Sequence, residues 1–468
     1  MAIKVFQHYL HLPLALLACL EGGLFLSAPY LAAMVRFRTA DIAAVEHIAG
    51  SILPRAIVFA GGMLVAMAAM GMYNARQRSR LLGMLTRILA ALTATLLMCA
   101  VVYYALPYLF LGRGALLITA VIAFGAAALI RIAFDRMVDE EMFKRRIVVY
   151  GAGRRASSIA KLRRRSDRRG FTVEGYLSAE GDEPGLVPSE LCIVAPNSLL
   201  AFCQEHLVDE IVVAMDDRRR GFPMDQLLEC RLEGVDITEL VTFFERETGK
   251  VRLDVLNPSW MIFSDGFRQG RLNGLLERSF DVMVSLVLLV VTFPVALLAV
   301  LAIKLEDGLR APTLYRQTRV GQYGRPFKLM KFRSMRVDAE SAGKPIWAAK
   351  NDSRVTRVGA FMRKTRIDEI PQVLNVLRGE MSFVGPRPER PEFVSQLNER
   401  IPYYRERHSI KPGLTGWAQL CYPYGSSEQD AAEKLQYDLF YVKNHSPLFY
   451  LAIVVQTVEV IVWGKGAR

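Results

Sequence analysis

The chain has 468 residues, of which 52% are hydrophobic and 22% are charged, and its formal net charge is +13. This apolar fraction excludes an intrinsically disordered chain, because abundant apolar side chains can offset the entropy that is lost on folding. The length also excludes a small disulfide scaffold. An excess of both apolar residues and positive charge is typical of proteins that bind a membrane surface or nucleic acid.

Four apolar segments lie in the first part of the chain. They are Leu12–Val35, Ala56–Ala75, Ile88–Gly112 and Gly114–Ile130, and only Glu21 within them carries a formal charge. A helix needs about 20 residues to cross a hydrocarbon core of ~30 Å. The sequence therefore predicts a membrane protein with a unit of four transmembrane helices over residues 1–137. Buried core helices of a soluble domain are the alternative, and a cleaved signal peptide fits poorly because three more spans follow.

Basic residues mark the side of the membrane on which the loops lie. Four arginines and no acidic residue lie between the second and third segments, and five basic residues follow the fourth segment. Because positive loops favour the cytoplasm, both ends of the unit are predicted to be cytoplasmic. We interpret Glu21 as a helix-packing or near-interface residue, since no partner is evident in the sequence; a functional intramembrane acid is the alternative.

A different pattern begins at Arg145 and predicts a Rossmann-like α/β domain over residues 145–265. Buried strands are expected at Arg146–Tyr150, Thr172–Leu177 and Glu210–Met215. Gly151, Gly153 and Ala156 match G-x-G-x-x-A, so their turn is a candidate nucleotide site in which backbone N–H groups would face a phosphate. A single fingerprint has low specificity, and Glu180 only loosely supplies the acid expected about 20 residues later. A structural or regulatory module is therefore favoured.

The 22 residues Val282–Ile303 form a further uncharged segment with Pro294 near its midpoint. As a straight helix it would be about 33 Å long, which is enough to span the membrane. Both flanks are basic, however, and a spanning helix cannot have both ends in the cytoplasm. Since proline removes a backbone donor and kinks a helix, we predict a re-entrant helix–break–helix over about residues 279–304. Ser285 or Thr292 hydroxyls are expected to pair with the freed carbonyls, and an ordinary fifth span is the alternative.

Basic residues gather downstream of this segment, on both sides of the acid pair Asp368-Glu369. They are Lys328, Lys331, Arg333, Arg336, Arg354, Arg357, Arg363, Lys364 and Arg366. Such a lining suits a diphosphate. No nucleic-acid partner is expected, because the sequence contains no DNA- or RNA-binding motif. Consecutive helical residues point about 100° apart, so one carboxylate could attack a phosphorus atom while the other holds a metal ion.

Six stretches of the C-terminal region carry a resemblance to a known family. They are Gln317–Phe327, Lys331–Met335, Asp368–Gln372, Asn375–Pro388, Lys411–Gln419 and Tyr441–Asn444. Together they resemble the monotopic phosphoglycosyl transferases that start bacterial polysaccharide synthesis. The whole layout is similar to their long forms, the polyprenyl glycosylphosphotransferases of exopolysaccharide assembly. One departure is Arg366-Ile367, where the family commonly has Ser-Leu. The resemblance implies a mostly α catalytic domain over residues 275–468.

This resemblance implies a reaction as well as a fold. A sugar-1-phosphate would move from a UDP-sugar to undecaprenyl phosphate, with release of UMP, at the cytoplasmic face of the bacterial inner membrane. Asp368 matches the family's nucleophile, which forms an aspartyl phosphosugar intermediate, and Glu369 matches the residue that helps to bind Mg²⁺. The long forms also imply a homodimer. Phosphate- or nucleotide-binding side chains are expected at Lys331, Arg333, Arg363, Arg387 and Lys411.

Two other functions are compatible with parts of the sequence. A membrane-anchored nucleotide-sugar dehydratase or epimerase can share the four spans and the first α/β layer. It needs a Tyr-x-x-x-Lys pair, which Tyr437–Tyr441 does not supply. A non-catalytic scaffold of polysaccharide assembly is the other alternative.

The remaining features of the sequence indicate no disulfide or zinc site. The six cysteines form no C-x-x-C pair, and the histidines show no zinc spacing. The apolar segment Pro447–Trp463 predicts a helix that lies on the membrane, packs there or spans it.

Overall fold

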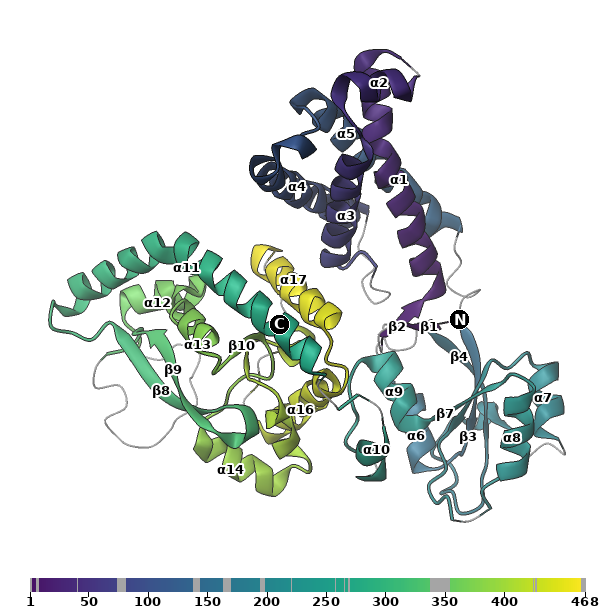
Figure 1. Ribbon diagram of the computed structural model, residues 1–468. Coiled ribbons are helices and arrows are strands. Elements are labelled where there is room, and N and C mark those ends of the chain that lie inside the picture. Colours follow the sequence, from purple (N-terminus) through teal and green to yellow (C-terminus); the bar gives the residue numbers. More distant parts are fainter. Residues whose placement is uncertain are drawn as a thin grey trace. The chain divides into compact units, whose positions relative to one another are not determined.

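A computed structural model describes residues 2–5, 8–39, 41–73, 81–137, 144–162, 170–193, 198–219, 221–256, 258–264, 266–267, 270–336, 354–423, 425 and 427–463. These residues form two compact units, Met1–Gly249 and Lys250–Arg468. Most of them are helical, and a five-stranded sheet lies in the first unit (Figure 1). The predicted domain limits at residues 265 and 275 stay predictions.

The first unit begins with the hairpin β1 (Ala2–Val5) and β2 (His8–His11) and continues with helices. These are α1 (Leu12–Phe37), α2 (Ile42–Ala49), α3 (Leu53–Ala69), α4 (Leu81–Ala105), the 3₁₀ turn η1 (Pro107–Leu109) and α5 (Arg113–Met137). By length and composition, α1, α4 and α5 can cross a membrane, and so can α11 of the second unit. The protein is therefore a membrane protein, and three of the four predicted spans overlap α1, α4 and α5.

Helix α3 is shorter than the predicted span Ala56–Ala75. It has 17 residues and ends at Ala69, after which the chain turns with Gly71 at φ 68°. Uncharged residues continue through this turn, so the absence of charge could not show where the helix ends. The last predicted residues of that span lie outside the described part of the chain.

Glu21 lies in α1 with a fully buried side chain. Its Oε1 atom is 2.6 Å from Nε of Arg131 in α5, and the Tyr73 hydroxyl donates a hydrogen bond to the same carboxylate. Arg131 also donates to the Met72 carbonyl at 2.9 Å, and so ties α1 and α5 to the turn after α3. An unpaired buried charge would be strongly destabilising. The predicted packing role of Glu21 thus depends on a partner 110 residues away, which the sequence did not reveal.

Five parallel strands form the sheet of the first unit in the order β5-β4-β3-β6-β7. They are β3 (Arg145–Tyr150), β4 (Phe171–Leu177), β5 (Cys192–Ile193), β6 (Glu210–Val213) and β7 (Asp236–Glu239), and they confirm the predicted parallel α/β layer. The connections contain α6 (Arg154–Ala160), the 3₁₀ turn η4 (Ser189–Leu191), α7 (Leu199–Glu205) and α8 (Met224–Leu232), and α9 (Leu240–Thr248) follows the last strand. Strand β3 is fully buried at residues 147–149, as expected for a parallel sheet covered on both faces.

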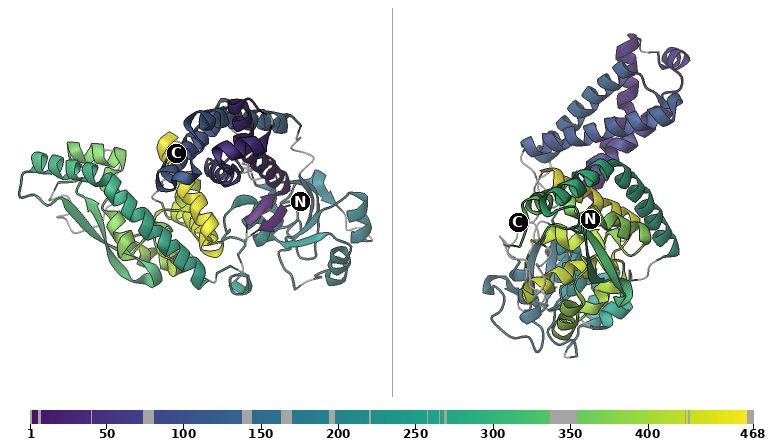
Figure 2. Two further views of the ribbon diagram at one scale, coloured as in Figure 1. Left: turned by 45° about the horizontal axis from the view of Figure 1, so that its top comes forward. Right: turned by 90° about the vertical axis from the view of Figure 1, so that its left-hand side faces the viewer.

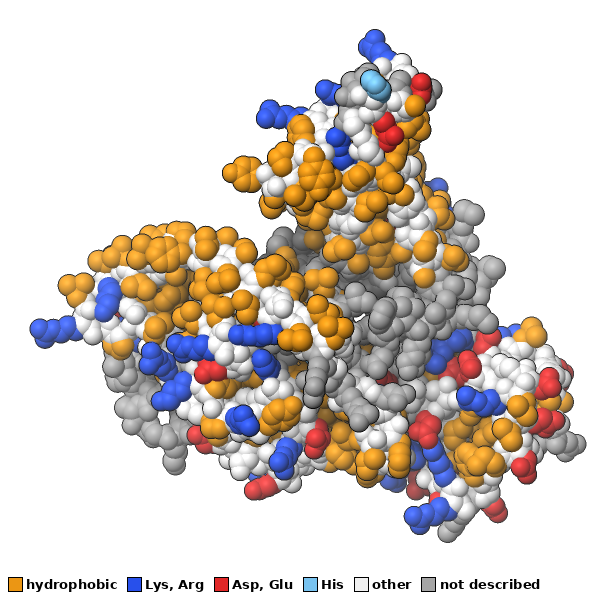
Figure 3. All heavy atoms as spheres, in the orientation of Figure 1, with side chains coloured by type: hydrophobic (Ala, Val, Ile, Leu, Met, Phe, Trp, Pro, Cys, Tyr) orange, Lys and Arg blue, Asp and Glu red, His pale blue; other side chains and the backbone are white. Residues whose placement is uncertain are grey.

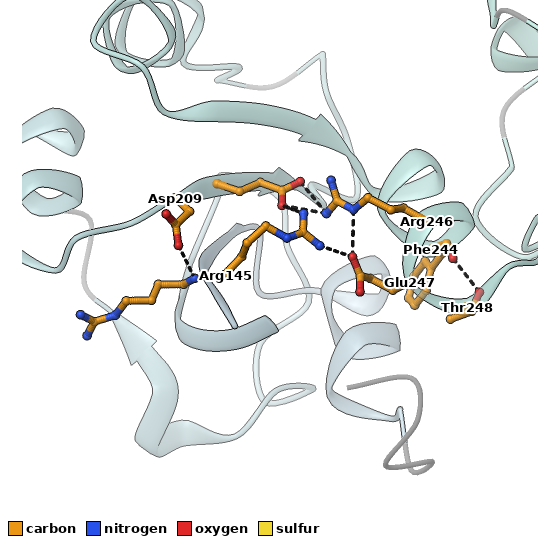
Figure 4. A network of polar contacts seen from close by, with 8 residues as sticks. Arg145, Asp209, Phe244, Arg246, Glu247 and Thr248 are labelled. Atoms are coloured by element: carbon orange, nitrogen blue, oxygen red, sulfur yellow. Dashed lines mark hydrogen bonds and ion pairs between the residues drawn. The ribbon is translucent and has the colours of Figure 1, made fainter. Parts of the chain in front are cut away.

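A buried ion-pair network closes the N-terminal edge of this sheet (Figure 4). Arg145 at the start of β3 is 2.6 Å from Glu210 at the start of β6, and it also contacts Glu247 of α9. Arg246 completes the network at 2.7 Å from Glu210 and 2.8 Å from Glu247. Burial opposes the charge of Glu247, but the two guanidinium groups outweigh burial and lower the pKa of this carboxyl. The network therefore joins α9 to the sheet.

The second unit is mostly helical, with short strands. In chain order it contains α10 (Pro258–Phe263), α11 (Arg271–Asp307), β8 (Leu314–Val320), η5 (Gln322–Gly324), β9 (Pro326–Phe332), α12 (Arg357–Thr365), η6 (Ile367–Glu369), α13 (Gln372–Arg378), β10 (Ser382–Val384), α14 (Pro391–Arg400), η7 (Tyr404–Ser409), β11 (Gly413–Thr415), α15 (Trp417–Cys421), α16 (Glu428–Lys443) and α17 (Pro447–Trp463). Strands β8 and β9 form an antiparallel hairpin. The apolar core includes Val376, Met381, Tyr441 and, from α17, Phe449 and Ile453, so α17 packs on this unit.

Helix α11 runs as one helix of 37 residues through Pro294, where a break between two helices had been predicted. It bends near its middle, and both arms descend toward the same unit (Figure 1 and Figure 2). Pro294 leaves the Val290 carbonyl without its helical donor, which is a usual cause of a kink. The Thr292 hydroxyl donates instead to the Leu288 carbonyl at 2.6 Å, and the buried Ser285 hydroxyl has no partner in the described residues. The chain thus bends without leaving the helix.

Candidate active site

The acid pair Asp368-Glu369 lies in the 3₁₀ turn η6, directly after α12. Helix α12 ends at Thr365 because Arg366 adopts the left-handed conformation at φ 60° and turns the chain. The start of α12 lies against the chain just after strand β9: a Cβ atom at Gly359 would be 2.1 Å from the Ser334 carbonyl oxygen. This close approach, which only glycine permits, brings the acid pair to the strand that carries Lys331.

Glu369 is surrounded by three cations. Its Oε1 atom is 3.2 Å from Nζ of Lys331, 3.4 Å from Arg366 and 3.8 Å from Arg387. Burial would raise the pKa of Glu369, but these positive charges outweigh burial and lower that pKa below its ordinary value. Glu369 is therefore a carboxylate at neutral pH.

The pKa of Asp368 is shifted in the opposite direction, although Asp368 is the adjacent residue. Its side chain is 7% exposed, and its Oδ1 atom has no hydrogen-bond partner in the described part of the chain. Burial, followed by the negative charge of Glu369, raises the pKa of Asp368, while Lys331 and Arg363 act in the opposite direction. A buried carboxylate oxygen that accepts no hydrogen bond is rare and is typical of a reactive group.

Lys331 is held in place by a buried amide on the neighbouring helix. Asn375 of α13 accepts a hydrogen bond from the Met330 backbone at 3.0 Å and donates to the Lys328 carbonyl at 2.9 Å. The two contacts fix strand β9 on either side of Leu329. Burial lowers the pKa of Lys331, against the opposing effect of Glu369.

Arg387 lies in a turn between two prolines, and a second buried network holds this turn. Arg407 of η7 donates to the Arg387 carbonyl at 3.1 Å, is 2.8 Å from the Asp438 carboxylate of α16, and donates to the Tyr404 hydroxyl at 2.6 Å. The Arg387 side chain then reaches Glu369, and it donates to Gln419 of α15 at 3.5 Å. The elements η7 and α16, which lie outside the turn, thus position Arg387.

The structure brings together most, but not all, of the predicted site residues. The charges of Lys331, Arg363 and Arg387 act on the acid pair, and the phosphate- or nucleotide-binding role expected for these residues stays a prediction. The guanidinium group of Arg333 is buried and pairs with Asp307 at the end of α11, at 2.6 Å. Lys411 lies near Arg278, Asp281 and Glu277, whose charges act on it. Arg333 thus pairs with a residue of α11, and Lys411 lies near charged residues of α11. The phosphate-binding role predicted from the sequence does not explain these contacts.

Sequence reasoning did not single out four residues that shape the site, Asn375, Gln419, Arg407 and Asp438, nor the contact that Arg366 makes. Arg366 was noted as a departure from the family pattern, and the structure makes it a partner of Glu369. Asn375 and Gln419 lie within the stretches that carry the resemblance, which was a signal for their importance. Arg407 and Asp438 gave no signal, because their pairing depends on the packing of η7 on α16.

The carboxylates of Asp368 and Glu369 could take part in holding a metal ion. In the described residues, no three His, Cys, Asp or Glu side chains form a metal cluster. Mg²⁺ is commonly held by one or two carboxylates together with substrate phosphates. The Asp368 oxygen that has no partner among the described residues and the charged Glu369 fit such a shared site.

The bacterial sugar transferase model matches residues 272–464, which include the acid pair and the cations around it. A UDP-glucose:undecaprenyl-phosphate glucose-1-phosphate transferase of Klebsiella pneumoniae is 33% identical over 322 residues, which is 67% of this chain and 67% of that protein. The chain belongs to the bacterial sugar transferase family. An exopolysaccharide production protein, PSS, of Rhizobium leguminosarum bv. phaseoli is 40% identical over 41% of this chain and 98% of its own length.

A third similar protein extends well beyond the region that it shares with this chain. It is a UDP-N-acetylgalactosamine-undecaprenyl-phosphate N-acetylgalactosaminephosphotransferase of Aeromonas hydrophila, 36% identical over 52% of this chain and 56% of that protein. The chain thus spans little more than half of that relative. A second model, a CoA-binding domain, matches residues 68–229 of the sugar transferase and includes the glycine-rich turn.

The glycine-rich turn of this sugar transferase has the backbone that its sequence predicts. Gly151 has φ 129°, and a Cβ atom there would be 2.6 Å from the Ala214 backbone. Gly153 and Ala156 lie at the start of α6. Glu180, the loosely expected acid, lies beside Gly221, and the carboxylates of Asp182 and Asp216 contact the turn in its place.

Proposed function

We propose that this sugar transferase moves a sugar-1-phosphate from a UDP-sugar to undecaprenyl phosphate and releases UMP. The names of the Klebsiella and Aeromonas relatives describe this class of reaction. The observation that carries the proposal is the buried Oδ1 atom of Asp368, which lies among cations and has no hydrogen-bond partner in the part of the chain that the structure describes. The dehydratase or epimerase and the scaffold gain no support from the comparisons.

In the first step, an Asp368 carboxylate oxygen attacks the phosphorus that bears the sugar. A bond from that oxygen to phosphorus forms, and the bond from phosphorus to the bridging diphosphate oxygen breaks. UMP leaves with the bridging oxygen and its electron pair, and the protein carries an aspartyl phosphosugar. Lys331 and Arg387, which already face the acid pair, would bind the diphosphate and stabilise the charge on the leaving UMP.

In the second step, a phosphate oxygen of undecaprenyl phosphate attacks the phosphorus of the aspartyl phosphosugar. The new bond gives undecaprenyl-diphosphate-sugar, and the bond to Asp368 breaks, which restores the free carboxylate. Splitting one displacement into two lets the same cations stabilise both transition states. Burial strengthens these interactions because the local dielectric constant is low.

Glu369, together with Asp368 and the substrate diphosphate, would hold Mg²⁺. Such an ion, when bound, neutralises phosphate charge. Glu369 is suited to this role because the surrounding cations keep it ionised. In the structure, Lys331 and Arg366 pair with it and balance its charge.

The contacts of α11 support a re-entrant placement at the cytoplasmic face. In its first arm, Arg278 donates to the Val376 carbonyl at 2.7 Å, and Asp281 accepts a hydrogen bond from Ser382 at 3.2 Å. In its second arm, Asp307 pairs with Arg333, and Glu306 accepts a hydrogen bond from the Arg357 backbone at 2.8 Å. A straight helix of this length would be ~55 Å long, and its ends could not both contact one domain on one side of the membrane.

The outer face of α11 is apolar, and Figure 3 shows it as a continuous surface above a band of lysine and arginine side chains. Its exposed side chains are Leu286, Val287, Val290, Val291, Phe293, Leu297, Leu298 and Leu301. An apolar face of this size beside a basic band suits a helix that dips into the hydrocarbon core while the cations meet lipid phosphates. We propose the inner membrane of a bacterium as its location, with the catalytic unit in the cytoplasm. A homodimer stays a prediction.

The reaction is tested by giving the purified protein a UDP-sugar in the absence of lipid acceptor. We expect a single burst of UMP, about equal to the amount of protein, and a phosphosugar adduct on the peptide that contains Asp368. Addition of undecaprenyl phosphate should discharge the adduct and start steady turnover. A panel of UDP-sugars identifies the sugar. UMP release that strictly requires undecaprenyl phosphate, without any adduct, would contradict the two-step reaction.

The topology is tested by cysteine labelling from one side of sealed vesicles. Leu272 lies in the first turn of α11, Leu309 lies two residues after its end, and both side chains are exposed. Single cysteines at these two positions should react with an impermeant maleimide from the same side. Labelling from opposite sides would show that α11 spans the membrane.

A further inference from the structure

The match to a CoA-binding domain raises the question of whether the glycine-rich turn of the first unit binds a phosphate-bearing ligand. CoA and dinucleotides carry a diphosphate. In a Rossmann-like layer, that diphosphate lies against backbone N–H groups at the start of the helix that follows the first strand. The N–H groups that would serve here belong to Ala152, Arg154 and Arg155, between β3 and α6.

All three of these backbone donors are already bound to carboxylates of the same chain. Asp216 accepts hydrogen bonds from the Arg154 and Arg155 backbones, each at 2.8 Å and each through a different oxygen. Asp182 accepts a hydrogen bond from the Ala152 backbone at 2.7 Å. The two side chains thus take the position and the hydrogen bonds that a phosphate would take.

The carboxylates leave no room for a phosphate beside the turn. A Cβ atom at Gly153 would be 2.1 Å from Oδ2 of Asp216 and 3.2 Å from Oδ1 of Asp182. Both acids therefore lie in direct contact with the turn. A diphosphate would have to displace them, and it would be repelled by their negative charges.

Further hydrogen bonds hold the two acids in place. Asp182 also accepts a hydrogen bond from the Ala179 backbone at 3.0 Å, and its other oxygen accepts one from the Asp216 backbone at 3.2 Å. Asp182 follows β4 and Asp216 follows β6, the strands on either side of β3. Side chains from both neighbouring loops thus close the edge of the sheet at which ligands of this fold usually bind.

We infer that the turn at residues 151–156 binds no CoA or nucleotide diphosphate, and that Asp216 and Asp182 serve as its permanent anions. The α/β layer is then a self-capped structural module. The residues of this chain do not fit the ligand for which the matching domain model is named.

Hydrogen exchange of the full-length protein in nanodiscs, read by mass spectrometry, tests the cap. We expect peptides that cover residues 150–156 to be protected without any ligand. Asp216→Ala should speed exchange at Arg154 and Arg155 by tenfold or more. Glu205→Gln is the matched control, because it removes one negative charge from an exposed side chain at the end of α7 in the same unit, and exchange should not change. Rapid exchange of these amides in the unmodified protein would overturn the inference.

Titration with CoA and with ADP completes the test. We expect no saturable binding up to millimolar concentration and no added protection of residues 150–156. Continued protection of the β3 core in every sample confirms that the unit is folded, including in Asp216→Ala. Saturable CoA binding that increases the protection of residues 150–156 would overturn the inference.

Discussion

The two units each place a pair of carboxylates beside a short helical turn, and the two pairs differ in one respect. In the α/β layer, Asp216 and Asp182 accept hydrogen bonds from every backbone donor of the glycine-rich turn that they face. In the catalytic unit, Glu369 is paired with cations, and a buried oxygen of Asp368 accepts no hydrogen bond from the described residues. Both carboxylates of the first pair thus accept hydrogen bonds, whereas in the second pair only Glu369 has partners for its charge and one oxygen of Asp368 has no partner among the described residues.

Both pairs consist of acidic residues, so residue type does not distinguish a carboxylate that stabilises the fold from one that can react. The number of hydrogen bonds and ion pairs that each carboxylate makes does distinguish them. A carboxylate whose oxygens are all bound stabilises the fold and has little free electron density to offer a substrate. A buried carboxylate that lacks donors is destabilising by itself, and its lone pair is available for attack. Substitutions at the two pairs should therefore have opposite effects on stability and turnover.

The largest effect is expected for Asp368→Asn. It keeps the shape of the side chain but removes the nucleophile, so UMP release should fall on the order of 10³-fold or more. The melting temperature should stay the same or rise, because burial disfavours the charge that is lost. Glu399→Gln, an exposed acid on α14, is the control and should change neither property. Turnover retained by Asp368→Asn would rule out Asp368 as nucleophile.

A smaller effect is expected for Lys331→Met. Loss of this cation removes a charge that lowers the pKa of Asp368, so that pKa should rise further. Because the attacking group must be ionised, the acidic limb of kcat/KM should move to higher pH. The loss at neutral pH should be about 10- to 100-fold, as for a hydrogen bond to a charged group. Lys331→Arg should restore the position of the limb, and an unmoved limb in Lys331→Met would contradict the coupling.

The satisfied pair should show the reverse behaviour. Asp216→Asn keeps one acceptor oxygen but loses the charge and one of the two backbone hydrogen bonds. We expect a loss of about 1–2 kcal/mol in the free energy of unfolding of the first unit, typical of a lost helix cap. UMP release should be unchanged. Reduced turnover at full stability would mean that the α/β layer takes part in catalysis.

The smallest effect concerns His408, a buried titratable group beside Arg407. Burial, and then the Arg407 charge, lowers the pKa of His408 to about 4. The unfolded state, with an ordinary histidine pKa, binds more protons between that value and about 6.5, so stability falls as pH falls through this window. At pH 5.5 the loss is on the order of 1 kcal/mol. The His408→Gln variant should not show this loss of stability at pH 5.5. Parallel curves of stability against pH for both proteins would contradict the assignment of the loss to His408.

The sequence by itself determined the features that depend on local pattern. Runs without charge identified α1, α4 and α5, alternating strand and helix signals identified the parallel sheet, and family motifs identified Asp368 and Glu369. Each of these is encoded in neighbouring residues, because hydrophobic period, turn chemistry and motif spacing are local properties.

Only the tertiary structure decided which polar groups are satisfied. The partner of Glu21 is 110 residues away, Arg333 and Lys411 lie near residues of α11, and Asp182 and Asp216 fill a turn whose sequence predicts a phosphate site. A buried charge or donor must find a partner, but packing determines which one, from any part of the chain. For this reason the sequence could identify the acid pair, whereas its protonation and the closure of the glycine-rich turn depend on contacts between distant segments.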